Sequence, residues 1–242
     1  METLRIDEIL KGIRAKVEEQ KTVVRVRYMP YDLQASMQLI EAIGKAKSEK
    51  YRLDSDNKFL YENLVRWVHG DPDFLCTDPK TKQNTKGNLN AGVYIAGGTG
   101  TGKSWAMEII SYYANLDDAI FRTSATNAVS LVFPCHRTDV ICDEYTRSGE
   151  VSNVKYAPIV CFQDLGSNAE QIESMYMGNR LQVMQNILES RGDRRDVITM
   201  ITSNLPFTHP LFIKRYGDRV TSRLYEMCNY YELKGIDRRE LK

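Results

Sequence analysis

The chain of 242 residues lacks several features that define other classes of protein. No apolar run approaches the roughly 18 residues that a membrane span needs, and the polar first residues do not resemble a signal peptide, so we expect a cytoplasmic protein with no membrane contact. The five cysteines are scattered without Cys-x-x-Cys spacing, which argues against both a disulfide framework and a zinc site. No internal repeat or low-complexity tract is present.

The sequence also lacks an excess of charge of either sign. Its 33 Lys and Arg residues balance 32 Asp and Glu residues, which leaves a formal net charge of +1. Global basicity therefore gives no sign of nucleic-acid binding, and any contact with DNA must rest on a local patch. The hydrophobic share of 42% and the charged share of 27% are ordinary for a globular protein. The length suits one α/β domain with a short N-terminal extension.

A complete phosphate-binding loop stands out against this background. It fills the pattern G-x-x-x-x-G-K-[ST] with Gly97, Gly98, Thr99, Gly100, Thr101, Gly102, Lys103 and Ser104. Glycine tolerates positive φ and lets the backbone come close to a ligand, so successive N–H groups can converge on phosphate oxygens. Lys103 adds a charge for the β- and γ-phosphates, and the Ser104 hydroxyl is suited to Mg²⁺.

The segments on either side of this loop support the same interpretation. Residues 93–96 form a short apolar run typical of a strand, and Trp105 continues into a stretch typical of a helix. The N-terminus of that helix would point its dipole at the bound anion. We therefore predict that residues 97–105 bind ATP together with Mg²⁺, and that Ser104 is one of the metal ligands.

A carboxylate for the second half of the site is predicted at Asp164. It comes soon after the apolar run 158–162, which is typical of a strand buried in a parallel sheet. Such strands normally end in two acids, the first for the metal and the second for the attacking water, but here Gln163 precedes Asp164. Either Asp164 activates the water and an amide stands at the metal side, which would weaken Mg²⁺ binding and slow hydrolysis, or the strand end is rotated and Asp164 serves the metal.

Two further features complete the predicted site. A second apolar run, 197–201, ends near Asn204, whose amide is suited to hold the attacking water beside a γ-phosphate. Arg219 and Arg223 lie four residues apart, on one face of a predicted helix. Such a pair is either a solvated helix face or the source of an arginine finger for the γ-phosphate of a neighbouring subunit. The predicted catalytic residues are Lys103, Asp164, Asn204 and Arg223.

The order of the predicted elements indicates an α/β fold. Apolar runs typical of strands alternate with helical patterns from residue 93 onward, which predicts a mostly parallel sheet with helices on both faces. We place a boundary near residue 55, between an N-terminal partner-binding region (1–55) and an ATPase domain (56–242). The other predicted elements are a loop over 71–90, strands over 119–122 and 197–202, and helices over 4–19, 32–47, about 56–70, 126–133, 137–146, 179–190, 210–215 and 218–227.

These features, in this order, resemble the AAA+ ATPases of the DnaC and IstB group, which comprises bacterial and phage helicase loaders and transposition helper ATPases. The resemblance runs from about residue 56 to 230. It rests on the loop at 97–104, Gln-Asp-Leu-Gly at 163–166, Thr-Ser-Asn-Leu at 202–205 and Asp-Arg-Val-Thr-Ser-Arg-Leu at 218–224. The loop is generic, whereas Asp-Leu-Gly, Thr-Ser-Asn-Leu and Ser-Arg-Leu together are fairly specific.

What this resemblance implies goes beyond the residues themselves. It makes Asn204 the sensor-1 residue and Arg223 the arginine finger, with Arg219 as second choice. It implies a P-loop AAA+ core without the helical lid domain that larger AAA+ proteins carry. It also implies self-association through Arg223, assembly on single-stranded DNA, and delivery of a replicative helicase that residues 1–55 would grip, with weak to moderate ATP hydrolysis.

Two other functions stay open from the sequence. A transposition helper ATPase would carry the same residues and differ in its partner. A P-loop kinase for a small molecule would need a substrate pocket and an arginine-bearing lid, for which the arginine-rich stretch 191–195 is a candidate. That stretch lies directly before the strand that leads to Asn204, where a connecting turn is expected, so the kinase is the least favoured of the three.

Overall fold

A five-stranded sheet forms the centre of the computed structural model, which describes residues 11, 24–25, 28–123 and 127–240. All of its neighbouring strands pair in parallel, in the order β12-β4-β11-β8-β7. The strands are β4 (Gly92–Gly97), β7 (Cys135–Arg137), β8 (Ile159–Leu165), β11 (Ile198–Ser203) and β12 (Cys228–Leu233). Because the strands are parallel, their carboxyl ends meet at one edge, where ligands of such sheets bind.

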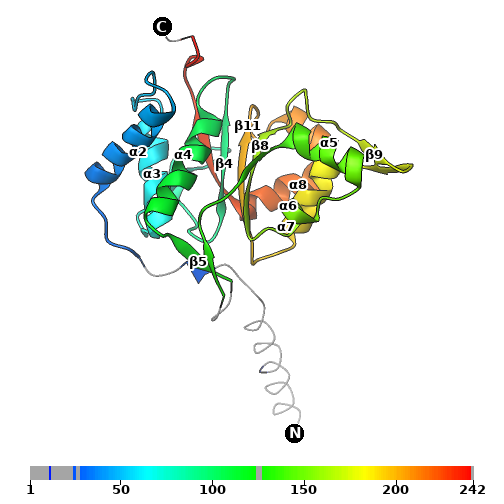
Figure 1. Cartoon of the computed structure of the whole chain (residues 1–242), viewed down its shortest axis with the longest axis horizontal. Coiled ribbons are helices and arrows are strands. Elements are labelled where there is room, and N and C mark those ends of the chain that lie inside the picture. Colours follow the sequence, from blue (N-terminus) through cyan, green and yellow to red (C-terminus); the bar gives the residue numbers. More distant parts are fainter. Residues whose placement is uncertain (1–10, 12–23, 26–27, 124–126, 241–242) are drawn as a thin grey trace.

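Helices cover both faces of this sheet (Figure 1). Those on one face are α2 (Leu33–Lys47), α3 (Lys58–His69) and α4 (Lys103–Leu116), and those on the other are α5 (Thr138–Ser148), α6 (Ser152–Lys155), α7 (Val183–Gly192) and α8 (Pro210–Met227). Alternate strand residues serve the two faces: in β4, Val93 and Ile95 join the first core, and Tyr94 and Ala96 join the second. The predicted mostly parallel sheet with helices on both faces is confirmed.

Three small antiparallel sheets lie outside the central one. They consist of β1 (Val24–Arg25) with β5 (Ile120–Arg122) and β6 (Ala128–Ser130), of β2 (Leu75–Thr77) with β3 (Asn84–Lys86), and of β9 (Ser174–Tyr176) with β10 (Asn179–Leu181). The strand predicted over 119–122 is therefore present as β5 but pairs outside the central sheet. The segment 71–90, predicted as a loop, contains the β2–β3 hairpin.

Two predicted helices are wrong in whole or in part. The segment 126–133 contains strand β6, because these residues pair with β5, and Val129 and Leu131 pack in the core. The segment 179–190 begins as strand β10, and α7 starts only at Val183. The helix predicted over 4–19 lies outside the described residues except for Lys11, which is helical.

Several helix ends lie where local chemistry predicts them. Asp32 caps α2, since its carboxylate accepts a hydrogen bond of 2.9 Å from the N–H of Ala35. Gly70, with φ of 67°, ends α3 in the left-handed conformation. Gly217, with φ of 81° and ψ of 165°, breaks α8 into the two helices predicted from the sequence.

Part of the predicted N-terminal region (1–55) packs in the core of the molecule. Ile40 of α2 is fully buried in the same hydrophobic cluster as residues of α3 and α4.

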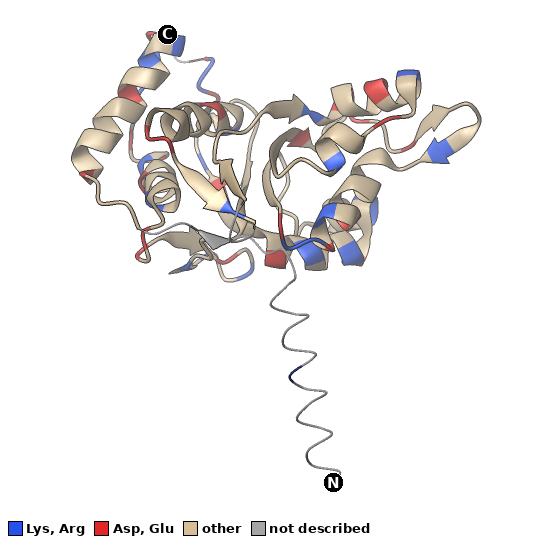
Figure 2. Ribbon diagram, turned by 60° about the horizontal axis from the view of Figure 1, so that its bottom comes forward, with Lys and Arg blue, Asp and Glu red and all other residues tan. Residues whose placement is uncertain are grey.

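No helix in the described ranges is long and apolar enough to cross a membrane. Figure 2 shows Lys and Arg interspersed with Asp and Glu over the described ribbon, so the balance of charge in the composition also holds in space.

Candidate nucleotide-binding site

The phosphate-binding loop joins β4 to α4 at the carboxyl edge of the sheet. Gly100 and Gly102 have φ of 76° and 99°, in the region that residues with a Cβ rarely adopt. Since α4 begins at Lys103, the N–H groups of its first turn have no partner within the helix and are free for an anion. The local sequence thus produces the loop shape that phosphate binding requires.

A cavity of about 480 Å³ opens over this loop, a size suited to a nucleotide. The loop and the start of α4 contribute Thr99, Gly100, Thr101, Gly102, Lys103, Ser104 and Trp105. The ends of β7, β8 and β11 contribute Arg137, Asp164 and Asn204, and the flanking segments contribute, among others, Tyr51, Tyr61, Arg238 and Arg239. The structure therefore brings Lys103, Asp164 and Asn204 together, while Gly97 and Gly98 lie beside the cavity as hydrogen-bond partners of Lys103.

Lys103 links the loop to the end of β11. Its Nζ donates to the carbonyl oxygens of Gly97 (2.9 Å) and Gly98 (2.7 Å) and to Oδ1 of Asn204 (2.9 Å). Burial lowers the pKa of Lys103, and the charge of Asp164 acts in the opposite direction. The ammonium group of Lys103 thus lies between the loop and the amide of Asn204. A phosphate group bound at the loop would contact both the ammonium group and the amide.

Asp164 reaches the cavity because β8 is irregular at this point. The pairing of β8 with β11 shifts register between Phe162 and Leu165, as in a β-bulge. Asp164 has φ of 59°, which is uncommon for a residue other than glycine. Its N–H donates to Oγ1 of Thr202 (3.1 Å), and its C=O accepts from Oγ1 of Thr138 (3.2 Å). These bonds hold a strained backbone in place, and the carboxylate lines the cavity.

Gln163 is directed away from the loop, towards α4. Its Nε2 donates to Oε1 of Glu108 at 3.3 Å, and Glu108 also forms an ion pair with Lys47 of α2. Among the residues that the structure describes, those lining the cavity include Asp164 but not Gln163. Of the two alternatives left by the sequence, this geometry favours the rotated strand end, with Asp164 as the carboxylate that lines the cavity.

The oxygen donors at the cavity fit a magnesium ion. Ser104 and Asp164 both line it, and Mg²⁺ is usually held by one or two carboxylates together with substrate phosphates and water. No group of three or more His, Cys, Asp or Glu residues suited to a metal occurs in the described part of the chain. A metal at this site would therefore take its other ligands from the nucleotide and from water.

Arg219 and Arg223 lie on α8, after the break at Gly217. Both pair with Asp193 in the turn after α7: Nη2 of Arg219 lies 3.4 Å from Oδ2, and Nη2 of Arg223 donates to Oδ1. The described residues that line the cavity do not include either arginine. A residue that acts on the nucleotide of a neighbouring subunit needs this placement, outside the cavity of its own chain.

Comparisons with known proteins agree with this architecture. No family model matches the chain, and no curated protein sequence does. Among solved structures, the chain is similar to a protein of Streptococcus pyogenes serotype M3, provisionally described as a primosome component, with 17% identity over 75% of this chain and 81% of that chain and a TM-score of 0.50. The chain therefore shares the fold of that structure, an α/β fold with a parallel sheet covered by helices. The resemblance noted in the sequence is thereby confirmed at the level of the fold.

Two other solved structures are similar to the chain at the same identity of 17%. One is DnaI, with 87% of this chain and 94% of that chain covered and a TM-score of 0.49. The other is the DnaC helicase loader, with 76% of this chain and 93% of that chain covered and a TM-score of 0.48.

The arginine-rich stretch 191–195 is not a lid over the cavity, since none of its residues is among the described residues that line it. Arg191 is fully buried, and its guanidinium donates to Oγ1 of Thr199 (2.9 Å) and to the carbonyl oxygens of Ala157 and Ile198 (both 2.8 Å). Burial lowers its pKa to about 9. This side chain holds α7 against β11, so the feature that pointed to a kinase lid has a structural role.

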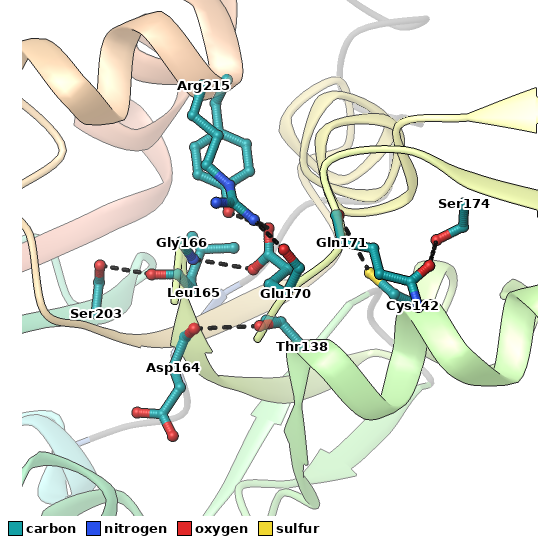
Figure 3. Close-up of polar contacts among 11 residues, drawn as sticks. Thr138, Cys142, Asp164, Leu165, Gly166, Glu170, Gln171, Ser174, Ser203 and Arg215 are labelled. Carbon is teal, nitrogen blue, oxygen red and sulfur yellow. Dashed lines mark hydrogen bonds and ion pairs between the residues drawn. The ribbon is translucent and has the colours of Figure 1, made fainter. Parts of the chain in front are cut away.

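Sequence reasoning missed the buried carboxylate that joins the end of β8 to α8 (Figure 3). Glu170 accepts hydrogen bonds from the N–H of Gly166 (2.9 Å), from Nη2 of Arg215 (3.1 Å) and from the hydroxyl of Tyr216. The Asp164 carboxylate lies away from this cluster in Figure 3. Glu170 and Arg215 are 45 positions apart, and no spacing pattern links them, so no sequence signal identifies the pair.

Proposed function

We propose that the protein is a Mg²⁺-dependent ATPase that helps to load a replicative helicase onto single-stranded DNA. The observation that carries this proposal is the placement of Lys103, Asp164 and Asn204 around one cavity, with Arg223 paired outside it. The likeness in fold to a protein described as a primosome component supports a role in replication over one in transposition. A cytoplasmic location fits this role.

Each residue of the cavity has a role in the proposed hydrolysis. Lys103 holds the β- and γ-phosphates, and the amide of Asn204 orients the attacking water. The Asp164 carboxylate lines the cavity and is assigned to the metal side of the site, so the proton of the attacking water passes to solvent. Bound Mg²⁺ would neutralise charge on the phosphates, with Ser104 and Asp164 as its protein ligands. Residues 97–105 then form the binding surface for the triphosphate.

Assembly would supply the residue that the cavity lacks. Arg223 and its neighbour Arg219 share one carboxylate, Asp193, which is exposed. A surface ion pair of this kind is weak, so the γ-phosphate of an adjacent subunit can replace Asp193 as the partner of Arg223. In this proposal ATP joins subunits on DNA, hydrolysis separates them, and residues 1–55 grip the helicase.

The test is ATP turnover of the full chain with Mg²⁺, measured with and without single-stranded DNA at several protein concentrations. We expect turnover per subunit to rise with DNA and with concentration, because both favour assembly. An ATP turnover rate that is unchanged by DNA but depends on a small-molecule phosphate acceptor would instead identify a kinase. A pull-down with the full chain as bait, with and without ATP, would identify the helicase partner, and Lys103→Ala serves as the control for ATP dependence.

A further inference from the structure

The C-terminal strap, defined here as residues 235–240, packs against the phosphate-binding loop. It follows β12, the strand beside β4, and the chain therefore leaves the sheet at the same edge as the loop (Figure 1). The N–H of Arg238 donates to the C=O of Gly100 at 2.9 Å. Asp237 lies so close to Gly100 that a Cβ added to Gly100 would be 1.8 Å from Oδ1 of Asp237. The strap is thus part of the cavity wall.

Arg239 is one of two cations of the strap that line the cavity, the other being Arg238. It is exposed, and it lines the cavity together with Lys103 and Ser104. Its backbone N–H donates to Oδ1 of Asp237, but its guanidinium has no hydrogen bond or ion pair with any residue that the structure describes. The pKa of Lys103 is lowered mainly by burial and further by the charge of Arg239, as expected of two cations in one cavity. A polyanion is the ligand that relieves this repulsion.

Arg238 fastens the strap to the segment before α3. Its guanidinium makes two parallel hydrogen bonds to Asp54, with Nη1 to Oδ2 at 2.9 Å and Nη2 to Oδ1 at 2.7 Å. This hydrogen bonding is the largest cause that holds the pKa of Asp54 below its usual value. Gly235 also lies against Asp56. The strap is therefore joined to the segment before α3, beside the cavity that Arg238 lines.

We propose that the C-terminal strap senses the nucleotide of its own subunit: Arg239 binds the phosphate chain of ATP, and Arg238, paired with Asp54, is the positioning residue that keeps Arg239 at the cavity. This inference rests on the proposed nucleotide binding and adds residues to that site. Since the triphosphate carries more negative charge than the diphosphate, the strap favours ATP over ADP. Asp54 lies at the end of the predicted partner-binding region (1–55). A movement of the strap on nucleotide binding would therefore act directly on that region through the Arg238–Asp54 pair.

The first experiment measures the dissociation constants of the full chain for fluorescent analogues of ATP and ADP in the presence of Mg²⁺. We expect Arg239→Ala to weaken binding of the ATP analogue about 5- to 20-fold, and binding of the ADP analogue less. The matched control is Lys234→Ala, which removes the same charge from an exposed side chain just before the strap and is expected to stay within about twofold of the wild type. Equal effects of the two variants would overturn the role of Arg239.

The second experiment separates positioning from general stability. Arg238→Gln and Asp54→Asn are each expected to weaken binding of the ATP analogue. The affinity of the double variant is expected to equal that of the single variant with the lower affinity, because the two residues act as one unit. Arg238→Lys keeps the charge but loses the parallel bonds, so it restores only part of the affinity. Losses that add fully in the double variant would overturn the positioning role.

The rise in Tm that the ATP analogue causes is a readout that a merely structural role would not move. Without nucleotide, Arg239→Ala is expected to melt at the temperature of the wild type, whereas the rise in Tm caused by the ATP analogue is expected to be smaller. A wild type that fails to bind the analogue, or a Lys103→Ala variant that binds as tightly as the wild type, would show that the proposed nucleotide site itself is wrong. A wild type that binds, with Arg239→Ala indistinguishable from Lys234→Ala, would show that only the strap inference is wrong.

Discussion

The two walls of the candidate nucleotide cavity are built in opposite ways. One wall is the loop 97–104, eight consecutive residues whose shape follows from local glycine conformations. The facing wall contains Asp164 and Asn204, which come from different strands and meet because β11 lies between β4 and β8 in the sheet. The loop wall is therefore specified locally, whereas the facing wall depends on strand order and register.

The backbone shows the same contrast. In the loop, positive φ falls on Gly100 and Gly102, where it costs little. In the facing wall it falls on Asp164, where the hydroxyl groups of Thr138 and Thr202 hold the strained conformation. Changes in the loop wall should therefore reduce nucleotide binding, whereas changes in or behind the facing wall should reduce stability or turnover.

The largest expected effect comes from the support of the facing wall. Arg191→Leu removes the donor to the carbonyl oxygens of Val154 and Ala157 and to the hydroxyl of Thr199, from a side chain that is fully buried. We expect the free energy of unfolding to fall by about 3 kcal/mol, as measured by urea denaturation. Arg195→Leu is the control, since Arg195 is exposed and its replacement should change stability by less than about 0.5 kcal/mol. Equal losses in the two variants would contradict the buried role of Arg191.

The loop wall is tested by Lys103→Ala. Loss of a charged donor to the phosphates is expected to reduce affinity for a fluorescent ATP analogue by about 2–3 kcal/mol, or roughly 30- to 150-fold. Fluorescence titration of the full chain measures this change, with Lys234→Ala as the charge-matched control. Unchanged affinity of Lys103→Ala would mean that the loop does not hold the phosphates.

The proposed action of Arg223 on the nucleotide of a neighbouring subunit is tested by Arg223→Ala. We expect this variant to bind ATP as the wild type does, because Arg223 is paired with Asp193 away from the described cavity lining. Turnover in the DNA-assembled state should fall at least about tenfold, against the roughly thousandfold that an arginine finger contributes in fast enzymes. Arg219→Ala is the comparison variant and should have the smaller effect. Equal fractional losses of turnover in dilute and assembled protein would refute action on a neighbour.

The smallest expected effect concerns the missing acid of β8. In Gln163→Asp the new carboxylate would be directed towards Glu108 rather than towards the loop. We therefore expect Mg²⁺-dependent turnover to stay within about twofold of the wild type, with a slight loss of stability from the two like charges. Magnesium titrations of the ATPase rate measure this effect. A several-fold increase would instead show that Asp164 does not serve the metal and that the amide at position 163 limits hydrolysis.

Prediction from the sequence succeeded where neighbouring residues decide the structure. The end of α3 at Gly70 and the break between the helices predicted over 210–215 and 218–227 each depend on one residue and its immediate neighbours. It failed over 126–133, where Ala128–Ser130 forms a strand because β5 offers a partner. It also missed Glu170, whose partner Arg215 comes close only through the packing of α8.

The sequence by itself determined the phosphate-binding loop and the alternation of strands and helices, because glycine conformations and side-chain periodicity act over a few residues. Only the tertiary structure decided which face of β8 carries Asp164, where Arg223 finds its partner, and that the C-terminal strap lies on the loop. These outcomes depend on a bulge in one strand, a turn after α7 and the position of β12 at the edge of the sheet. The physical reason is that contacts between distant segments follow from sheet order and register, which local patterns do not encode.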